Sequence, residues 1–285
     1  MNPKNGALVT GGTGFLGHGL VPALLERGYE RVCILSRGEH AQAAMRESFN
    51  DDERLRWFVG DVRDVERLRW AFRDVDLVIH AAALKRIEVG RYNPGEMVQT
   101  NVLGTQNVIR AAMDCGVSRV VGVSSDKAWQ PVSPYGQSKA MAESLMLAAN
   151  EQGGQYGPVF TVCRYGNVAG STGSVIPRWR ALKAAGVPCP VTDPECTRFW
   201  MSRNEAVRFV LRAATEHIEG CPGVLVPTLP AFRLGDLAQA LDVETNVIGL
   251  GAWEKQHEGM MDGVTSDLAR RMSVDEIRQR LEADC

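Results

Sequence analysis

The stretch Thr10-Gly11-Gly12-Thr13-Gly14-Phe15-Leu16-Gly17 follows a short apolar run, Ala7–Thr10, and precedes an amphipathic run, Leu20–Arg27. In that setting the spaced glycines permit a tight turn, close approach of the backbone to a pyrophosphate, and close packing of the helix. The N–H groups at the start of a helix also attract an anion. The stretch therefore predicts a dinucleotide-binding loop at the first strand–helix junction. The residues predicted to bind the dinucleotide here are Gly11, Thr13, Gly14, Phe15, Leu16 and Gly17.

The alternation of short apolar runs with helix-like segments continues to about residue 165. Strands are expected at Ala7–Thr10, Val32–Leu35, Leu55–Val59, Leu77–His80, Val120–Ser124 and Val159–Tyr165. Helices are expected at Leu20–Arg27, Val65–Phe72, Asn101–Cys115 and Ser138–Asn150. Because strands that alternate with helices form right-handed βαβ units, the pattern predicts a doubly wound parallel Rossmann sheet of the α/β class.

Glycine and proline become dense after residue 165, and the regular alternation stops. Helices are still expected near Arg203–His217, Gly235–Leu241 and Val274–Glu282. We therefore expect residues 1–165 to form a dinucleotide-binding domain. Residues 166–285 are expected to form a smaller, loop-rich substrate-binding region, from which the chain can re-enter the first domain.

Composition limits the class of protein. The chain has 285 residues, 45% of them hydrophobic, and its charge of −2 comes from 32 basic and 34 acidic residues. This balance excludes an intrinsically disordered chain and argues against a nucleic-acid or membrane partner. The sequence contains no apolar run of transmembrane length, and its polar start is unlike a signal peptide. The seven scattered cysteines lack metal-ligand spacing, so we expect no metal, reduced thiols and a cytoplasmic location.

The end of the second predicted strand bears on the choice between NAD and NADP. An acidic residue there would bind the ribose 2′-hydroxyl, but this chain has Ser36 and Arg37. Arginine offers a planar set of donors that suits a 2′-phosphate, so the pair favours NADP over NAD, with a solvated loop arginine as the alternative. After the third strand come Asp61 and Val62. Asp61 is a candidate for holding the adenine amino group, or an ordinary turn residue.

Ser125, Tyr135 and Lys139 form the first candidate catalytic group. Tyr135 and Lys139 are four residues apart, so they share one face at a helix start. An ammonium group beside a phenol lowers the phenol pKa, which would let Tyr135 remove a hydroxyl proton as hydride leaves the same carbon. Ser125, at the tip of the fifth strand, can hydrogen-bond the same oxygen. Without this context, the Tyr-Lys spacing would fit an ordinary amphipathic helix.

Asp126 and Lys127 add a second ionisable pair at the carboxyl end of the fifth strand. A simple dehydrogenase or epimerase needs only the serine, tyrosine and lysine described above. An additional acid and an additional base are what the elimination of water requires. The alternative is a surface ion pair in a strand–helix turn.

These motifs together resemble an extended short-chain dehydrogenase/reductase. More narrowly, the chain resembles the UDP-N-acetylglucosamine 4,6-dehydratases of the 5-inverting type, which start pseudaminic acid and related sugar pathways. In the first half the resemblance rests on residues 10–17, 36–37, 60–64, 80–85, 100–105, 124–128 and 135–139. In the second half it rests on residues 164–168, 173–177, 192–194, 197–200 and 254–258.

The resemblance implies a role for each catalytic candidate. Tyr135 would remove the proton of the sugar 4-hydroxyl while hydride passes to NADP, and Lys139 would support Tyr135 and the nicotinamide ribose. Lys127 would remove the carbon 5 proton, and Asp126 would protonate the departing 6-hydroxyl. Hydride then returns to carbon 6, so the cofactor is recycled. This scheme expects a neutral Lys127, which burial or nearby positive charge would favour.

The resemblance also implies which residues line the rest of the site. The residues expected to flank the cofactor are Ala81, Ala82, Lys85 and Asn101. The residues expected to line the UDP and sugar pocket are Lys85, Asn167, Val175, Ile176, Thr192, Arg198 and Glu258. A structural arginine and a helix-capping glutamate are the alternatives for Arg198 and Glu258. A homo-oligomer, a dimer or larger, is expected through the helices at Asn101–Cys115 and Ser138–Asn150.

The chain departs from the family pattern at three points. Ser125 replaces the usual threonine, Arg86 replaces the usual histidine, and the C-terminal region is shorter. Independently of these departures, two alternative functions stay open beside the dehydratase. The first is a UDP-sugar 4-epimerase, or a 5-retaining dehydratase, on the same scaffold; in an epimerase Asp126 and Lys127 would be bystanders. The second is a non-catalytic NADP-sensing protein, which would have no need of Tyr135 and Lys139.

Overall fold

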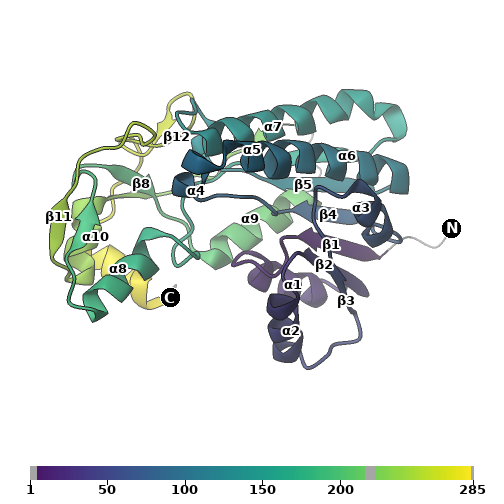
Figure 1. Cartoon of the computed structure of the whole chain (residues 1–285), viewed down its shortest axis with the longest axis horizontal. Coiled ribbons are helices and arrows are strands. Elements are labelled where there is room, and N and C mark those ends of the chain that lie inside the picture. Colours follow the sequence, from purple (N-terminus) through teal and green to yellow (C-terminus); the bar gives the residue numbers. More distant parts are fainter. Residues whose placement is uncertain (1–4, 216–222, 284–285) are drawn as a thin grey trace.

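A parallel sheet of seven strands is the centre of the structure, a computed structural model that describes residues 5–215 and 223–283 (Figure 1). The strand order is β3-β2-β1-β4-β5-β6-β9. These strands are β1 (Gly6–Thr10), β2 (Arg31–Ser36), β3 (Leu55–Val59), β4 (Leu77–His80), β5 (Arg119–Val123), β6 (Val159–Cys163) and β9 (Val224–Leu225). Because the order reverses between β1 and β4, the loops after these two strands diverge and leave a crevice at the carboxyl edge. The predicted doubly wound α/β sheet is confirmed.

Helices cover both faces of this sheet (Figure 1). One face carries α1 (Gly17–Glu26), α2 (Glu39–Ser48) and α9 (Arg203–Thr215), and the other carries α3 (Val65–Ala71), α6 (Gly104–Cys115) and α7 (Pro134–Gln152). Successive side chains of a strand point to opposite faces. In β1, accordingly, Ala7 and Val9 belong to the first hydrophobic core and Leu8 belongs to the second.

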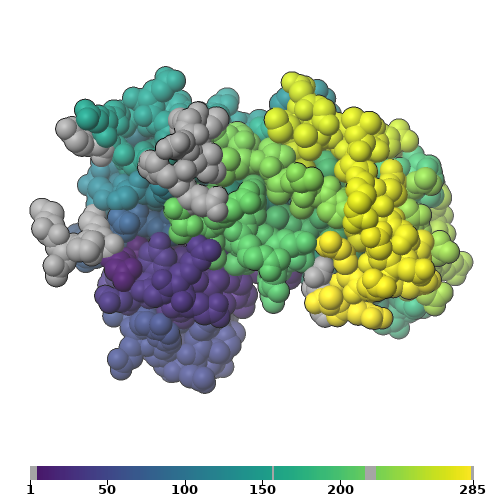
Figure 2. Space-filling model, turned by 180° about the vertical axis from the view of Figure 1, so that it is seen from behind, coloured from purple at the N-terminus to yellow at the C-terminus, as the bar shows by residue number. Residues whose placement is uncertain are grey.

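The C-terminal part of the chain forms a smaller body with a hydrophobic core of its own, and Figure 2 shows its last residues, in yellow, gathered at one end of the molecule. Trp179 and Trp200 are fully buried there, and Trp200 meets the ring of Phe232 edge-on at 5.4 Å. Its helices are α8 (Val175–Ala184), α10 (Leu234–Leu241) and α11 (Val274–Ala283). Its strands are β7 (Cys189–Val191), β8 (Thr197–Phe199), β10 (Ala231–Arg233) and β11 (Thr245–Val247). The antiparallel pair of β12 (Gly259–Met261) and β13 (Val264–Thr265) packs instead on the first hydrophobic core, through Met260 and Val264.

The predicted strands and helices of the first 165 residues are present, with ends shifted by a few residues. The helix expected at Ser138–Asn150 is α7, which begins earlier because Pro134 occupies its first turn and Ser133 accepts a hydrogen bond from the Gly136 amide. The segment expected at Asn101–Cys115 is divided into a π-helical stretch, η1 (Val98–Leu103), and α6. Shorter connecting helices are α4 (Ile87–Tyr92), α5 (Pro94–Met97), η2 (Asp126–Ala128) and η3 (Gly154–Tyr156).

Besides the short connecting helices, two helices of ten residues each were not predicted from the sequence. Helix α2 is mostly polar and buries only Gln42 and Met45, so its apolar stripe is too narrow to recognise. Helix α8 lies where glycine and proline suggested a loop; Pro177 is tolerated because it falls in the first helical turn.

The chain after residue 165 contributes to both parts of the molecule. Helix α9 packs on the sheet and β9 pairs with β6 at its edge. The helix predicted at Arg203–His217 is α9, and residues 216 and 217 lie outside the described residues. The domain boundary at residue 165 stays a prediction. Among the described residues, no helix is both long enough and apolar enough to cross a membrane.

Candidate active site

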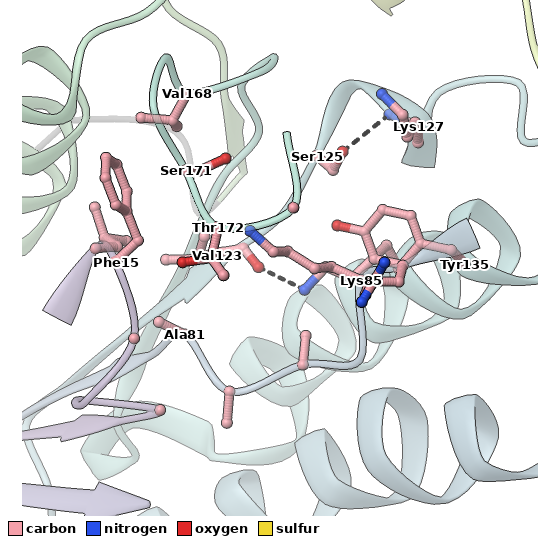
Figure 3. A pocket seen from close by; sticks show the side chains of 18 of the residues that line it. Phe15, Ala81, Lys85, Val123, Ser125, Lys127, Tyr135, Val168, Ser171 and Thr172 are labelled. Atoms are coloured by element: carbon pink, nitrogen blue, oxygen red, sulfur yellow. Dashed lines mark hydrogen bonds between the residues drawn. The ribbon is translucent and has the colours of Figure 1, made fainter. Parts of the chain in front are cut away.

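A pocket of about 950 Å³ lies at the carboxyl edge of the sheet, between the loops that follow its strands and the C-terminal body. Figure 3 shows two ends of this pocket, with Phe15 and Ala81 at one end and Ser125, Lys127 and Tyr135 at the other. In the described part of the chain, no group of three histidine, cysteine, aspartate or glutamate side chains could hold a metal ion.

The glycine stretch forms the wall at the first end. Gly11 has a φ of +66°, and a Cβ there would come within 2.9 Å of the Ala82 backbone. A Cβ on Gly14 would come within 3.0 Å of the Gly11 carbonyl oxygen. Gly11, Thr13, Gly14, Phe15 and Leu16 line the pocket. This hollow, which side chains would fill, fits the phosphates of a dinucleotide.

Gly17 has a different place from the one expected, because it does not line the pocket. A Cβ on Gly17 would overlap the Gly12 carbonyl oxygen at 2.0 Å. Gly17 therefore lets the first turn of α1 pack against the loop, and so positions the pocket wall indirectly.

Ser36, Arg37, Asp61 and Val62 line the pocket beside the glycine stretch. The Arg37 side chain is exposed, and Ser36 Oγ accepts a hydrogen bond of 3.0 Å from Gln42. Both carboxylate oxygens of Asp61 accept 3.0 Å hydrogen bonds from Arg63. Partial burial would raise the pKa of Asp61, but these hydrogen bonds lower it below its usual value. Asp61 is thus an ionised acceptor at this end of the pocket.

The loop after β4 supplies Ala81, Ala82 and Lys85 to the pocket lining, and burial lowers the pKa of Lys85. Asn101 was expected beside the cofactor, but it lies behind this loop and does not line the pocket. Its side chain hydrogen-bonds both the amide and the carbonyl of Leu84 at 2.8 Å, and it donates to Ser138 at 2.9 Å. Asn101 therefore fastens the loop to α7.

Tyr135 and Lys139 both lie on the first turns of α7 and line the pocket. Burial lowers the pKa of Lys139 to about 8, and its ammonium group donates to the Val123 carbonyl oxygen. Burial raises the pKa of Tyr135, while a hydrogen bond with Ser125 and the charge of Lys127 act in the opposite direction. The expectation of a lowered Tyr135 pKa is therefore wrong, because burial prevails.

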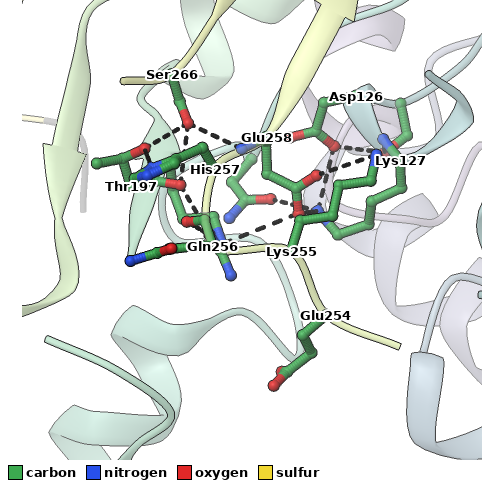
Figure 4. Close-up of polar contacts among 12 residues, drawn as sticks. Asp126, Lys127, Thr197, Glu254, Lys255, Gln256, His257, Glu258 and Ser266 are labelled. Atoms are coloured by element: carbon green, nitrogen blue, oxygen red, sulfur yellow. Dashed lines mark hydrogen bonds and ion pairs between the residues drawn. The ribbon is translucent and has the colours of Figure 1, made fainter. Parts of the chain in front are cut away.

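Asp126 and Lys127 form a cluster with Glu258, which comes from the segment before β12 (Figure 4). Lys127 Nζ lies 3.2 Å from Asp126 Oδ1 and 3.1 Å from Glu258 Oε1, and it donates to Asn167 Oδ1 at 3.4 Å. Ser125 Oγ donates to Asp126 Oδ1 at 2.9 Å. The other oxygens of the two carboxylates, Asp126 Oδ2 and Glu258 Oε2, are buried without a hydrogen-bond partner among the described residues.

The electrostatics of this cluster differ from expectation. Burial disfavours a charged Lys127, but the Asp126 and Glu258 carboxylates prevail and raise its pKa above the usual value. A neutral Lys127 was expected, and that expectation is wrong because the raised pKa favours the ammonium form. Burial raises the pKa of Asp126, which favours its protonated form. For Glu258, burial is outweighed by Lys127, Arg198 and Lys255, which lower the pKa.

Glu258 is held by its own neighbours. Its amide donates to Ser266 Oγ at 2.9 Å, and Ser266 Oγ lies 2.6 Å from Thr197 Oγ1, as Figure 4 shows. Arg198 donates to the Thr197 and Gln256 carbonyl oxygens at 2.8 and 3.1 Å. Arg198 and Glu258 both line the pocket, and their contact with substrate stays a prediction.

The remaining substrate-pocket predictions divide into two groups. Asn167 and Val175 line the pocket, whereas Ile176 and Thr192 do not. Ile176 follows Val175 in α8, and one helical step turns its side chain into the core beside Trp179. Thr192 lies in the turn between β7 and β8. The sequence reasoning also missed lining residues, of which Thr100, Ser171, Thr172, Trp253 and Lys255 are examples.

Comparisons with known proteins agree with this geometry. A family model described as a polysaccharide biosynthesis protein matches residues 7–279. Over 272 residues, the chain is 44% identical to the UDP-N-acetylglucosamine 4,6-dehydratase (inverting) of Campylobacter jejuni subsp. jejuni serotype O:23/36 (strain 81-176), with 94% of this chain and 80% of that protein covered. It is 36% identical over 264 residues to the UDP-glucose 4-epimerase of Rickettsia rickettsii (strain Sheila Smith), with 89% and 76% covered.

Among solved structures, the X-ray structure of Pen from Bacillus thuringiensis is similar, with a TM-score of 0.93 and 30% identity. The match covers 98% of this chain and 97% of that one. Since the family model spans nearly the whole sequence, this chain belongs to the polysaccharide biosynthesis protein family and has the extended short-chain dehydrogenase/reductase fold.

Proposed function

We propose that this protein is a nucleotide-sugar 4,6-dehydratase that acts on UDP-N-acetylglucosamine with inversion at carbon 5. The observation that carries the proposal is that Lys127 and Tyr135 line one pocket, with Asp126, which does not itself line the pocket, 3.2 Å from Lys127 Nζ. A buried carboxyl group with a raised pKa and a neighbouring amine are the acid and base that water elimination needs. The 44% identity to a dehydratase of this name supports the same substrate.

The dinucleotide is proposed to be NADP, held with its phosphates at Gly11 and Gly14 and its 2′-phosphate near Ser36 and Arg37. The exposed guanidinium of Arg37 can turn toward a phosphate without breaking a buried contact. When bound, the nicotinamide supplies the hydride acceptor at carbon 4 and the hydride donor at carbon 6. Tyr135 and Lys139 would lie along its ribose.

The chain's own residues then move the protons. Tyr135 Oη takes the proton of the 4-hydroxyl, helped by its hydrogen bond with Ser125. Lys127 Nζ passes its own proton to Asp126, 3.2 Å away, and then takes the carbon 5 proton. Asp126 gives the proton that it received to the departing 6-hydroxyl, which leaves as water. Burial raises the pKa of Asp126, which favours its receipt of this proton from Lys127.

Inversion at carbon 5 is the finer part of the proposal, and it rests on the name of the dehydratase relative. A retaining dehydratase would use the same pocket. A UDP-sugar 4-epimerase is the second candidate, favoured by the 36% identity to an epimerase. An epimerase needs Tyr135 and Lys139 but would give Asp126 and Lys127 no chemical task.

Proton NMR of the purified protein with UDP-N-acetylglucosamine, and no added cofactor, tests the proposal. We expect a new methyl signal from a 6-deoxy sugar, with couplings of the hydrated 4-keto product that report inversion at carbon 5. A galacto-configured product without a methyl signal would favour the epimerase. Couplings that report retention would leave the dehydratase but remove the finer claim.

We also infer a homo-oligomer. Val98 and Leu103 on η1 and Met141 on α7 are large apolar side chains that this single chain leaves exposed. Their burial against a second copy would remove apolar surface from water. Sedimentation equilibrium would contradict the inference if it gave the mass of one chain at micromolar concentration. The cytoplasmic location stays a prediction.

A further inference from the structure

A buried ion pair joins three segments that surround the acid–base cluster. Glu143 on α7 accepts hydrogen bonds from Arg164, which follows β6, through both of its carboxylate oxygens. Arg164 also donates to the carbonyl oxygen of Met260 in β12. The side chains are well shielded, since Glu143 is 5% exposed and Arg164 is 9% exposed. The pair thus connects the helix of Tyr135 with the strand that follows Glu258.

The Glu143–Arg164 pair is connected through neighbouring residues to the segment that carries Glu258. Ser124, at the end of β5, donates to Glu143, and the Arg164 guanidinium lies 5.5 Å from the centre of the Trp129 ring. The Trp129 carbonyl accepts from Lys255, three residues before Glu258. A Cβ on Gly259 would come within 2.8 Å of the Trp129 ring, so the backbone beside Glu258 is in tight contact with it. Arg164 therefore contacts two groups that adjoin Glu258 and Gly259: the Met260 carbonyl and the Trp129 ring.

We propose that the Glu143–Arg164 ion pair is a positioning device that holds Glu258 against Lys127 in the acid–base cluster. Neither side chain lines the main pocket, so both act through Glu258 and not on the substrate. The proposal rests on the proposed function for its catalytic meaning. It adds Glu143 and Arg164 to the residues that determine whether Lys127 is protonated.

The hydrogen-bond partners of Lys127 explain why the position of Glu258 matters. Lys127 has three N–H donors, and its three acceptors are Asp126, Asn167 and Glu258. If Glu258 withdraws, the lysine loses one of the two carboxylates that favour its ammonium form. The other charged or titratable groups facing the cluster are Arg198 from β8, Lys255 from the segment before β12, and Tyr135 from α7. Arg198 and Tyr135 lie on other elements than Glu258, whereas Lys255 belongs to the same segment.

An Arg164→Met variant tests the proposal through the titration of Lys127. The full chain would be labelled with ¹³Cε-lysine, and a Lys127→Arg variant would identify the Lys127 signal among the six lysines. We expect the Lys127 titration in Arg164→Met to move to lower pH by about 1 pH unit or more, as for loss of a nearby opposite charge. An Arg164→Lys variant keeps the charge but not the forked geometry, so we expect an intermediate shift.

Arg280→Met is the matched control. Arg280 in α11 pairs with Glu205 in α9 at 3.3 Å, in another part of the molecule. If the Glu143–Arg164 pair were only structural, Arg164→Met would lower the melting temperature and leave the Lys127 titration equal to that of Arg280→Met. That result would overturn the proposal. If Arg164→Met does not fold, the same comparison is made with Glu143→Gln, which keeps the shape of the side chain.

This readout is independent of turnover. If no methyl product forms from UDP-N-acetylglucosamine, the proposed function fails, but the Lys127 titration still decides the positioning claim. If product forms, the ascending limb of the kcat–pH profile should move to lower pH in Arg164→Met and stay in place in Arg280→Met. A limb that stays in place in both variants would contradict the proposal.

Discussion

The surroundings of Lys139 and Lys127 differ in one respect that determines their chemistry. Both side chains line the same pocket and both are largely removed from water. Lys139 has a backbone carbonyl as its hydrogen-bond partner, and burial lowers its pKa to about 8. Lys127 has two carboxylates as partners, and its pKa is raised. Burial alone therefore does not predict which lysine is neutral; the charge of the partner decides.

The largest effect is expected from the loss of Lys127 itself. In a Lys127→Ala variant, formation of the methyl product should fall by about 10²- to 10⁴-fold, the usual contribution of a general base. Lys183→Ala is the control. Lys183 lies on α8, contacts Leu241 and Asp242, and does not line the pocket. Equal formation of the methyl product by the two variants would mean that Lys127 is not the base of the elimination.

Stability gives the second test, since Lys127 neutralises two carboxylates. Lys127→Met should lower the free energy of unfolding by about 3 kcal/mol at pH 7, because Asp126 and Glu258 lose their shared cation. The raised pKa means that the contribution of Lys127 is complete below its unfolded pKa and is lost only as pH rises through the folded value. Guanidinium unfolding at pH 7 measures the change. An unchanged midpoint would contradict the assigned contacts.

Lys139 should behave in the opposite way. Below pH 8 the folded protein carries a buried ammonium to which no carboxylate of the described residues is bonded, so Lys139→Met should stabilise the protein by about 2 kcal/mol at pH 7. Because the folded pKa is lowered to about 8, wild-type stability rises between about pH 8 and pH 10.5 as the folded state loses this proton first. The difference in free energy of unfolding between Lys139→Met and the wild type should therefore decrease between about pH 8 and pH 10.5. Unfolding at pH 7 and pH 9.5 compares the two, and destabilisation at pH 7 would refute the assignment.

The smallest effect concerns the dinucleotide end of the pocket. Arg37→Ser should weaken NADP binding by about tenfold, since one charge-assisted hydrogen bond contributes about 1.5 kcal/mol. Binding of NAD, which lacks the 2′-phosphate, should change little. Calorimetric titration with both dinucleotides makes the comparison. Equal losses for both would mean that Arg37 does not read the 2′ position.

The sequence was sufficient for the parts of the site that local motifs encode. The glycine stretch, the Tyr135–Lys139 spacing and the Asp126–Lys127 pair all lie within a few residues of a strand end, so topology alone brings them together. The parallel sheet followed from the alternation of strands and helices. These predictions needed no knowledge of side-chain packing.

The sequence was insufficient where distant segments meet. The contact of Glu258 with Lys127 joins residues far apart in the chain, and it reversed the expected protonation of Lys127. The same holds for Asn101, which binds a loop and α7 instead of lining the pocket. Ile176 was wrongly predicted to line the pocket, because α8 begins at Val175 and the next residue in the helix points to the core. No local pattern encodes these outcomes.

The central claim is that Tyr135 and the Asp126–Lys127 pair carry out one internal oxidation, elimination and reduction on a nucleotide sugar. UDP-N-acetylglucosamine deuterated at carbon 4 tests it most directly, with the product methyl group examined by proton and deuterium NMR. We expect one deuteron to arrive in the new methyl group at carbon 6. Deuterium that remains at carbon 4 of a galacto-configured sugar, with no methyl signal, would contradict the dehydratase.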